Sequence, residues 1–145
     1  MTQLLPGSAD NPAMTEFEHE RLDVYRAAIE LLIVVDDVAS GLPKGRAYLA
    51  DQLRRAASSV PLNIAEGAGE FAAADKARFY RIARRSATES AAILDACRCL
   101  PLADESRLAA GRTLLLRIVA MLTAMVLRLT GSGSGSGSGS TDTAT

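Results

Sequence analysis

The chain has 145 residues, a length that suits a single domain able to bury about two-thirds of the surface of its unfolded chain. Apolar residues make up 48% of the sequence but aromatic residues only 4%, so the core must be aliphatic, which helices accommodate well. The net charge of −1 excludes a general electrostatic attraction to nucleic acid, although residues 43–100 carry ten basic and six acidic side chains.

Residues 1–14 are rich in proline and polar residues without apolar periodicity, and they predict a flexible leader. No positively charged region is followed by an apolar block, so no secretion signal is indicated and a cytoplasmic location is expected. The first helix is expected from Thr15, whose hydroxyl could cap it, to about Ala39. Gly41 and Pro43 then end it, because glycine accepts the left-handed conformation and proline prevents continuation.

An apolar stripe runs along this first helix at spacings of three and four residues. It is formed by Phe17, Val24, Tyr25, Ala28, Leu31, Leu32, Val35, Val38 and Ala39. Ile29, Ile33 and Val34 widen the stripe beyond what one core requires. We therefore expect these three side chains to contact another subunit.

The second helix is expected from about Arg46 to Gly67, with a bend at Pro61. Proline has no amide hydrogen, so the carbonyl of Ala57 is freed and a neighbouring side chain must serve it. The nearest candidates are Ser58, Ser59 and Asn63. One polar line at helical spacing, either solvated or in contact with a neighbouring helix, is formed by Gln52, Arg55, Ser59 and Asn63.

The third helix is expected from residues 73–75 to about Cys99, before Pro101. Its inward face is predicted to be small and apolar, and basic side chains decorate the rest. Cys97 and Cys99 point about 200° apart on such a helix and cannot pair with each other, so reduced thiols are expected.

The fourth helix is expected from residues 103–104 to Leu129. Its apolar run of about 14 residues is shorter than the roughly 20 needed to cross a bilayer, so no membrane span is expected. A helix that is apolar nearly all round must be covered on more than one side, and we expect another subunit to cover Leu115, Ile118, Leu122 and Met125. Residues 131–145, which contain five Gly-Ser repeats, predict a disordered linker and tail.

Four helices joined by short turns indicate an all-α, up-down-up-down four-helix bundle over residues 15–130. The second helix carries the motif Gln52-Leu53-Arg54-Arg55-Ala56-Ala57, Ser59-Val60-Pro61 and Asn63-Ile64-Ala65-Glu66-Gly67. Flanking segments extend it: Leu22-Asp23-Val24-Tyr25-Arg26-Ala27-Ala28, Arg78-Phe79-Tyr80-Arg81-Ile82-Ala83, Ser86 and Glu89. Together they resemble the four-helix-bundle family encoded in 23S ribosomal RNA intervening sequences, whose fold includes the accessory variability determinant of diversity-generating retroelements.

The resemblance implies a ring of five subunits, association with RNA and partnership with a reverse transcriptase. It assigns a structural motif to Gln52, Arg55, Ser59, Pro61, Asn63, Glu66, Gly67 and Glu89. In two positions the chain departs from the family, with Tyr25 where a tryptophan is common and Arg85 where a glycine often precedes the serine. The residues alone indicate only more than one subunit, joined through two different apolar helix faces.

Basic side chains of the second and third helices form the candidate nucleic-acid-binding band, because each can contact a phosphate without reading sequence. The band consists of Arg54, Arg55, Lys76, Arg78, Arg81, Arg84 and Arg85. In the alternative interpretation these residues form a solvated face, paired with Glu70, Asp75 and Glu89. The leading functional hypothesis is a non-enzymatic, homo-oligomeric scaffold that associates with RNA or an RNA-protein complex. The alternative is a purely structural protein-protein oligomerisation module.

No catalytic constellation is indicated by the sequence. Glu66 and Glu89 have no accompanying histidine or metal motif, so structural roles are expected, with Glu89 paired to Arg55 and Glu66 closing the second helix. His19 is expected to be exposed, and with the two cysteines it lacks the second paired motif of a zinc site. We therefore expect no enzymatic activity, cofactor, metal or small-molecule substrate.

Overall fold

The computed structural model describes residues 15–131, so the expected leader and nearly all of the Gly-Ser tail lie outside the described residues. Two short 3-10 turns, η1 (Glu18–Arg21) and η2 (Lys44–Arg46), accompany four helices. The helices are α1 (Asp23–Gly41), α2 (Ala47–Gly69), α3 (Ala73–Cys99) and α4 (Glu105–Gly131). No strand occurs within residues 15–131, and the all-α prediction is confirmed.

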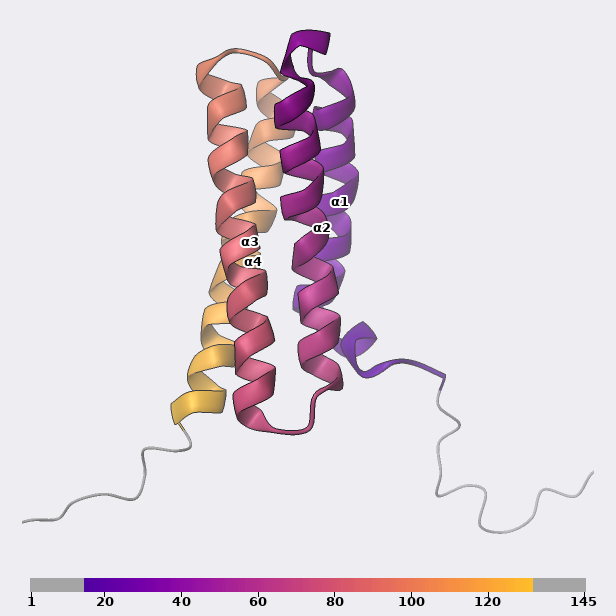
Figure 1. The fold of residues 1–145 in the computed structure, drawn as a ribbon, viewed down its shortest axis with the longest axis vertical. Helices are drawn as coiled ribbons and strands as arrows, with labels where there is room; N and C mark the ends of the chain where they lie inside the picture. Colours follow the sequence, from indigo (N-terminus) through magenta and orange to yellow (C-terminus); the bar gives the residue numbers. More distant parts are fainter. Residues whose placement is uncertain (1–14, 132–145) are drawn as a thin grey trace, which may run out of the picture.

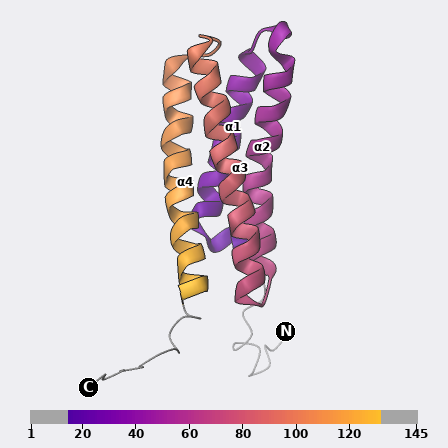
Figure 2. The same ribbon diagram turned by 60° about the vertical axis from the view of Figure 1, so that its left-hand side comes forward.

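The four helices form an antiparallel bundle in which each helix packs against two neighbours. α1 and α3 each contact both α2 and α4 (Figures 1 and 2). The α1–α2 and α3–α4 connections lie at one end of the bundle, whereas the α2–α3 connection lies at the other end, near η1 (Figure 1). The predicted four-helix bundle is confirmed, and its assembly into a ring stays a prediction.

The first helix begins later than the sequence predicted. α1 starts at Asp23, and Leu22 before it is extended, with φ −83° and ψ 126° and no side-chain cap, so the predicted cap at Thr15 is wrong. Phe17, which was expected on the buried stripe, is 65% exposed. Because η1 contains no buried residue, no core contact holds this segment in a continuous α-helix.

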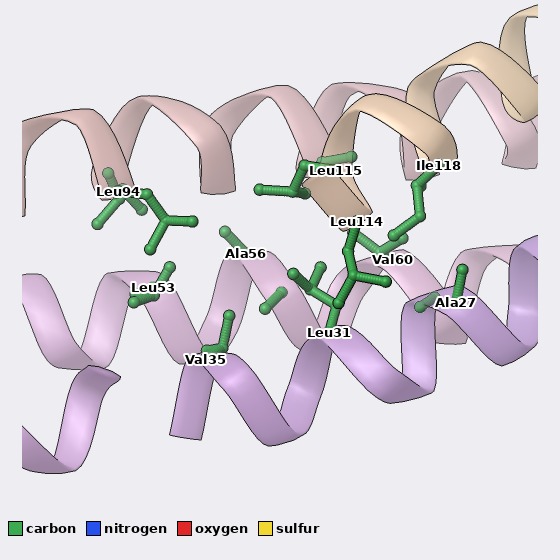
Figure 3. Close-up of a cluster of buried hydrophobic side chains, with 14 of the residues drawn as sticks. Ala27, Leu31, Val35, Leu53, Ala56, Val60, Leu94, Leu114, Leu115 and Ile118 are labelled. Atoms are coloured by element: carbon green, nitrogen blue, oxygen red, sulfur yellow. The ribbon is translucent and has the colours of Figure 1, made fainter. Parts of the chain in front are cut away.

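The core is aliphatic, as the composition required, and it draws on all four helices. Leu31 of α1, Leu53 of α2 and Ile118 of α4 are each 0% exposed, and Leu94 of α3 packs in the same cluster (Figure 3). Burying one such side chain contributes about 1.5–3 kcal/mol to folding. The interior of the bundle is therefore complete within one chain.

Three of the residues that were expected at a subunit interface instead belong to this core. Leu115, Ile118 and Leu122 of α4 are 2%, 0% and 0% exposed, so their assignment to an interface is wrong. Their spacing of three and four residues places them on the side of α4 that faces the bundle. The outer side of α4 instead presents Leu116 and Leu127, which are 60% and 64% exposed.

The other expected interface residues divide between the core edge and the surface. Val34 and Met125 are half-buried and pack against the core. Ile29 and Ile33 of α1 are 40% and 65% exposed. Surplus apolar surface therefore remains on the outer sides of both α1 and α4.

By length and composition alone, α4 is the one described helix that is long and apolar enough to cross a membrane. Of its most apolar 18-residue window, 22% is buried in the bundle. A bundle helix with a single buried face and an apolar outer face meets the same criterion. The buried face of α4 consists of Leu108, Gly111, Leu114, Leu115, Ile118 and Leu122.

Candidate functional site

A hydrogen-bonded seam joins α2 to α3 in the middle of the predicted polar line. The hydroxyl of Ser86 donates to Oγ of Ser59 at 2.8 Å. Nδ2 of Asn63 donates to both Oγ and the carbonyl oxygen of Ser59, at 2.9 and 2.8 Å. Buried Ser90 donates to the carbonyl of Ser86 at 2.9 Å. This part of the line is therefore a satisfied helix contact rather than a solvated face.

α2 is a continuous helix through buried Pro61. The hydroxyl of Ser58 donates to the carbonyl of Arg54, and Asn63 donates to that of Ser59, so each side chain bonds the carbonyl four residues before it. The prediction that Ser58, Ser59 or Asn63 serves the Ala57 carbonyl is therefore wrong. The bend at Pro61 stays a prediction.

Two glycines allow the helices on either side of α3 to approach it closely. A Cβ atom at Gly67 of α2 would lie 2.7 and 2.9 Å from two ring carbons of Tyr80 and 3.1 Å from Cβ of Phe79. A Cβ atom at Gly111 of α4 would lie 2.8 Å from Cδ1 of Leu94. Gly67 in the family-like motif therefore has a packing role against α3.

Gly67→Ala is expected to destabilise the protein by about 1–3 kcal/mol, because the 5% exposed Tyr80 ring must shift inside a packed interface. The better helix propensity of alanine offsets up to about 1 kcal/mol of this cost. Urea unfolding followed by circular dichroism measures the difference. Gly69→Ala is the matched control on the same helix, since nothing lies within 4 Å of a Cβ atom there. Equal stability of the two variants would contradict the packing role.

Two members of the predicted basic band hold neighbouring helices to one another. Arg54 of α2 reaches α1, where its guanidinium lies 3.8 Å from Asp36 and donates to Ser40 at 3.2 Å. Arg84 of α3 donates from Nε to Oγ1 of Thr123 on α4 at 2.8 Å. Sequence reasoning missed both partners, since Thr123 lies 39 positions from Arg84 and no local pattern links them.

A third member, Lys76, closes the end of α2. Its ammonium donates to the carbonyls of Gly67 and Ala68 at 3.4 and 3.0 Å. Cations are favourable at this end of a helix, where the last carbonyls lack amide partners. Lys76 is therefore occupied within the fold.

The remaining four members are exposed and pair with no carboxylate among residues 15–131; they are Arg55, Arg78, Arg81 and Arg85. The guanidinium of Arg78 lies over the ring of Phe79, 4.6 Å from its centroid. Arg81 and Arg85 line a hollow of about 550 Å³ together with Arg84, Thr88 and Glu89. Ion pairs with Glu70, Asp75 and Glu89, which the alternative interpretation expected, do not form in the described residues.

Glu89 and Glu66 do not take the roles expected of them. Glu89 accepts a hydrogen bond from Nε2 of Gln52 at 3.3 Å and does not pair with Arg55, so that prediction is wrong. α2 continues to Gly69, beyond exposed Glu66, so Glu66 does not close the helix. Glu66 lies about 21 Å along α2 from Gln52, the partner of Glu89, which separates the two carboxylates too widely for a general acid-base pair.

His19 is half-buried rather than exposed as predicted. Its ring stacks on Phe17 with the centroids 5.6 Å apart and meets the ring of Tyr25 edge-on at 4.5 Å. Cys97 and Cys99 are both free, which confirms that they do not pair. Burial raises the pKa of the Cys97 thiol, which keeps it protonated and unreactive at neutral pH.

Comparisons with known proteins agree with this architecture. No curated protein sequence matches the chain. It is similar to the crystal structure of a protein of unknown function from the S23 ribosomal protein family of Bacteroides thetaiotaomicron, with a TM-score of 0.66 and 17% identity over 71% of this chain and 97% of that one. At this identity the likeness shows the fold alone. The family model of the 23S rRNA-intervening sequence protein matches residues 20–124, from η1 through most of α4. The chain therefore belongs to the 23S rRNA-intervening sequence protein family.

Proposed function

We propose that this protein is a non-enzymatic, homo-oligomeric, cytoplasmic scaffold that associates with RNA or an RNA-protein complex through a basic face of α2 and α3. The observation that carries the proposal is the set of exposed arginines without a carboxylate partner: Arg55, Arg78, Arg81 and Arg85. Guanidinium groups bind phosphates bidentately and release counterions on binding. We call these four residues the arginine face.

Three of the four members of the arginine face lie on one helix, α3, whereas the other arginines that form no ion pair within residues 15–131, apart from Arg84, lie on η2 and α4; they are Arg46, Arg107, Arg117 and Arg128. Arg21, Arg26, Arg98 and Arg112 each lie within 4 Å of a carboxylate, as Arg54 does. Unpaired like charges repel one another, and an anionic ligand removes that cost. Phosphate contact is therefore the interaction that this surface favours most.

The proposed self-association uses the apolar surface that one bundle leaves exposed. Ile29 and Ile33 lie on the outer side of α1, and Leu116 and Leu127 lie on the outer side of α4. Two different apolar surfaces suit a head-to-tail contact, which closes into a ring when the rotation allows it. Five subunits follow from the family resemblance. Each copy would add one arginine face, and linked copies bind a long RNA more tightly than one copy.

A protein-protein oligomerisation module is the second candidate function. The exposure of Leu116 and Leu127 favours it, because an apolar helix face is covered most readily by another apolar protein surface. In that case the arginine face serves solubility. Binding to RNA separates the two candidates.

The triple variant Arg78→Glu, Arg81→Glu, Arg85→Glu is expected to bind structured RNA at least about tenfold more weakly than the wild type at moderate salt. Gel shifts at several salt concentrations also give the slope of log affinity against log salt, which is expected to fall by about two to three with the loss of three phosphate contacts. Circular dichroism checks that the variant is folded.

The matched control is Arg26→Glu, Arg107→Glu, Arg112→Glu, which makes the same change in charge on α1 and α4. It is expected to bind RNA close to the wild-type affinity. Equal losses in both triples would contradict an arginine face, since only net charge would then matter. Absence of binding by the wild type at low salt would favour the oligomerisation module.

A further inference from the structure

Phe71 is the most exposed of the large apolar side chains in residues 15–131, at 99%. It lies in the short connection between α2 and α3, at the end of the bundle opposite the α1–α2 connection (Figure 1). The ring belongs neither to the core nor to the side chains packed against the core, so the fold does not cover it. Single exposed apolar side chains are common on protein surfaces, and the surroundings of this ring therefore decide whether it has a binding role.

The α3 part of the arginine face begins seven residues after Phe71, on the helix that follows the connection. Arg78 lies about 7.5 Å along the axis from the first residue of α3, and Arg85 lies about 10 Å farther on. Arg81 lies between them, and spacings of three and four residues place all three on one side of α3. The guanidinium of Arg78 lies over the ring of Phe79, 4.6 Å from its centroid. An aromatic ring open to water therefore precedes a row of three arginines that pair with no carboxylate among the described residues.

Exposed aromatic rings beside a row of cations are the two elements with which proteins bind single-stranded nucleic acid. The cations follow the phosphates, and bases of any sequence stack on the rings. A base inside a duplex is already stacked and paired, so only an unpaired base can reach such a ring. The combination of α3 and the connection before it therefore favours a strand with unpaired bases.

The charges beside Phe71 favour a base over other occupants. Glu70 and Asp75 lie on either side of it in the sequence and form no ion pair within residues 15–131. Their negative charges repel a phosphate or an anionic membrane surface at this point, whereas a base carries no charge. The apolar surfaces proposed to join subunits lie on α1 and α4, and not at this connection.

The geometry points to Phe71 as a base-stacking residue for single-stranded RNA. One unpaired base lies on the Phe71 ring while the neighbouring phosphates are bound by Arg78, Arg81 and Arg85. This inference rests on the proposed function and adds to it the class of RNA that the arginine face takes, which is a strand with an unpaired base next to its bound phosphates.

The variant Phe71→Trp tests the stacking directly. Because the chain contains no tryptophan, this variant carries a single fluorescent indole at the proposed site. An oligoadenylate of about ten nucleotides is expected to quench the fluorescence, because a base stacks on the indole. A strand of equal length and charge that lacks bases is expected to leave the fluorescence unchanged. Phe71→Ala is expected to weaken binding of the oligoadenylate at least about fivefold, whereas Phe71→Trp retains the wild-type affinity.

Tyr48 supplies the matched control, because it is an exposed aromatic side chain, at 57%, near the other end of α2. It lies about 30 Å along the helix axis from the α2–α3 connection. Tyr48→Trp is expected to show no quenching by the oligoadenylate, and Tyr48→Ala is expected to leave the affinity unchanged. Circular dichroism checks that all four variants are folded.

The outcomes separate this inference from the proposed function. If the wild type binds no oligoadenylate at low salt, the arginine face is not an RNA site and both proposals fail. If binding depends on Arg78, Arg81 and Arg85 but Phe71→Trp is not quenched and Phe71→Ala binds normally, only the stacking role is overturned. A blue shift of the Phe71→Trp emission with anionic vesicles, without quenching by RNA, would also overturn it, in favour of a membrane surface.

Discussion

Leu122→Ala is expected to lower the free energy of unfolding by about 2–5 kcal/mol, because it removes buried methyl groups and leaves a cavity in the core. Leu122 is 0% exposed and faces the interior of the bundle from α4. The α4 backbone is held on two sides by α1 and α3, so it cannot collapse into the space. Urea unfolding followed by circular dichroism, at several protein concentrations, measures the change.

Leu127→Ala supplies the matched control, with the same substitution on the same helix. Leu127 is 64% exposed in one chain, so its truncation is expected to change the stability of a dilute subunit by less than about 0.5 kcal/mol. At higher concentration it is expected to weaken only the concentration-dependent part of the stability. If both variants lost a similar free energy of unfolding at low concentration, Leu122 would lie outside the core, which would contradict the orientation of α4 in the bundle.

Glutamate at both Ile33 and Leu116 is expected to raise the dissociation constant of the assembly at least about 100-fold, which corresponds to about 2.7 kcal/mol. These residues are 65% and 60% exposed and lie on the two apolar surfaces proposed to join subunits. A charge placed in such a contact loses water without gaining a partner. Sedimentation velocity at micromolar concentration measures the distribution of masses.

Tyr48→Glu, Leu62→Glu is the control for this pair, since both residues are exposed on α2, at 57% and 65%. It removes apolar surface to a similar extent but outside α1 and α4, and it is expected to leave the mass distribution unchanged. A well-folded wild type that sediments as one subunit at micromolar concentration would contradict the proposed scaffold. The arginine face would then have to bind as a single copy.

The positions of the helices followed from local patterns wherever those patterns also reflected burial. α3 was expected from residues 73–75 to Cys99 and runs from Ala73 to Cys99, because its periodic small residues lie against both α2 and α4. The first helix was misplaced because Thr15 matches a helix cap in sequence, while the η1 segment that follows it contains no buried residue. A capping pattern predicts a helix only where packing also holds it.

α4 shows a second limit of sequence reasoning. A helix that is apolar nearly all round has no polar side to mark its orientation, so periodicity could not assign Leu115 to the interior and Leu116 to the surface. The neighbouring helices decide this, and they are distant in sequence.

The sequence could predict which residue types form the candidate site. It could not predict which of their side chains would lack a partner within the fold. Arg84 and Arg85 are adjacent in sequence, yet only Arg84 reaches Thr123.

Gly67 of α2 and Gly111 of α4 each approach α3 closely, so α3 is held in a fixed position along both neighbouring helices. Arg78 and Arg85 are carried on it about 10 Å apart along the axis, and sliding either neighbour past α3 would drive backbone into the Tyr80 or Leu94 side chain. An RNA that binds the proposed arginine face must therefore adjust its own phosphates to the fixed spacing of the arginines. The conformational entropy lost on binding then falls mainly on the RNA. A flexible single strand can match its phosphates to this fixed arginine spacing more readily than a stiff duplex can.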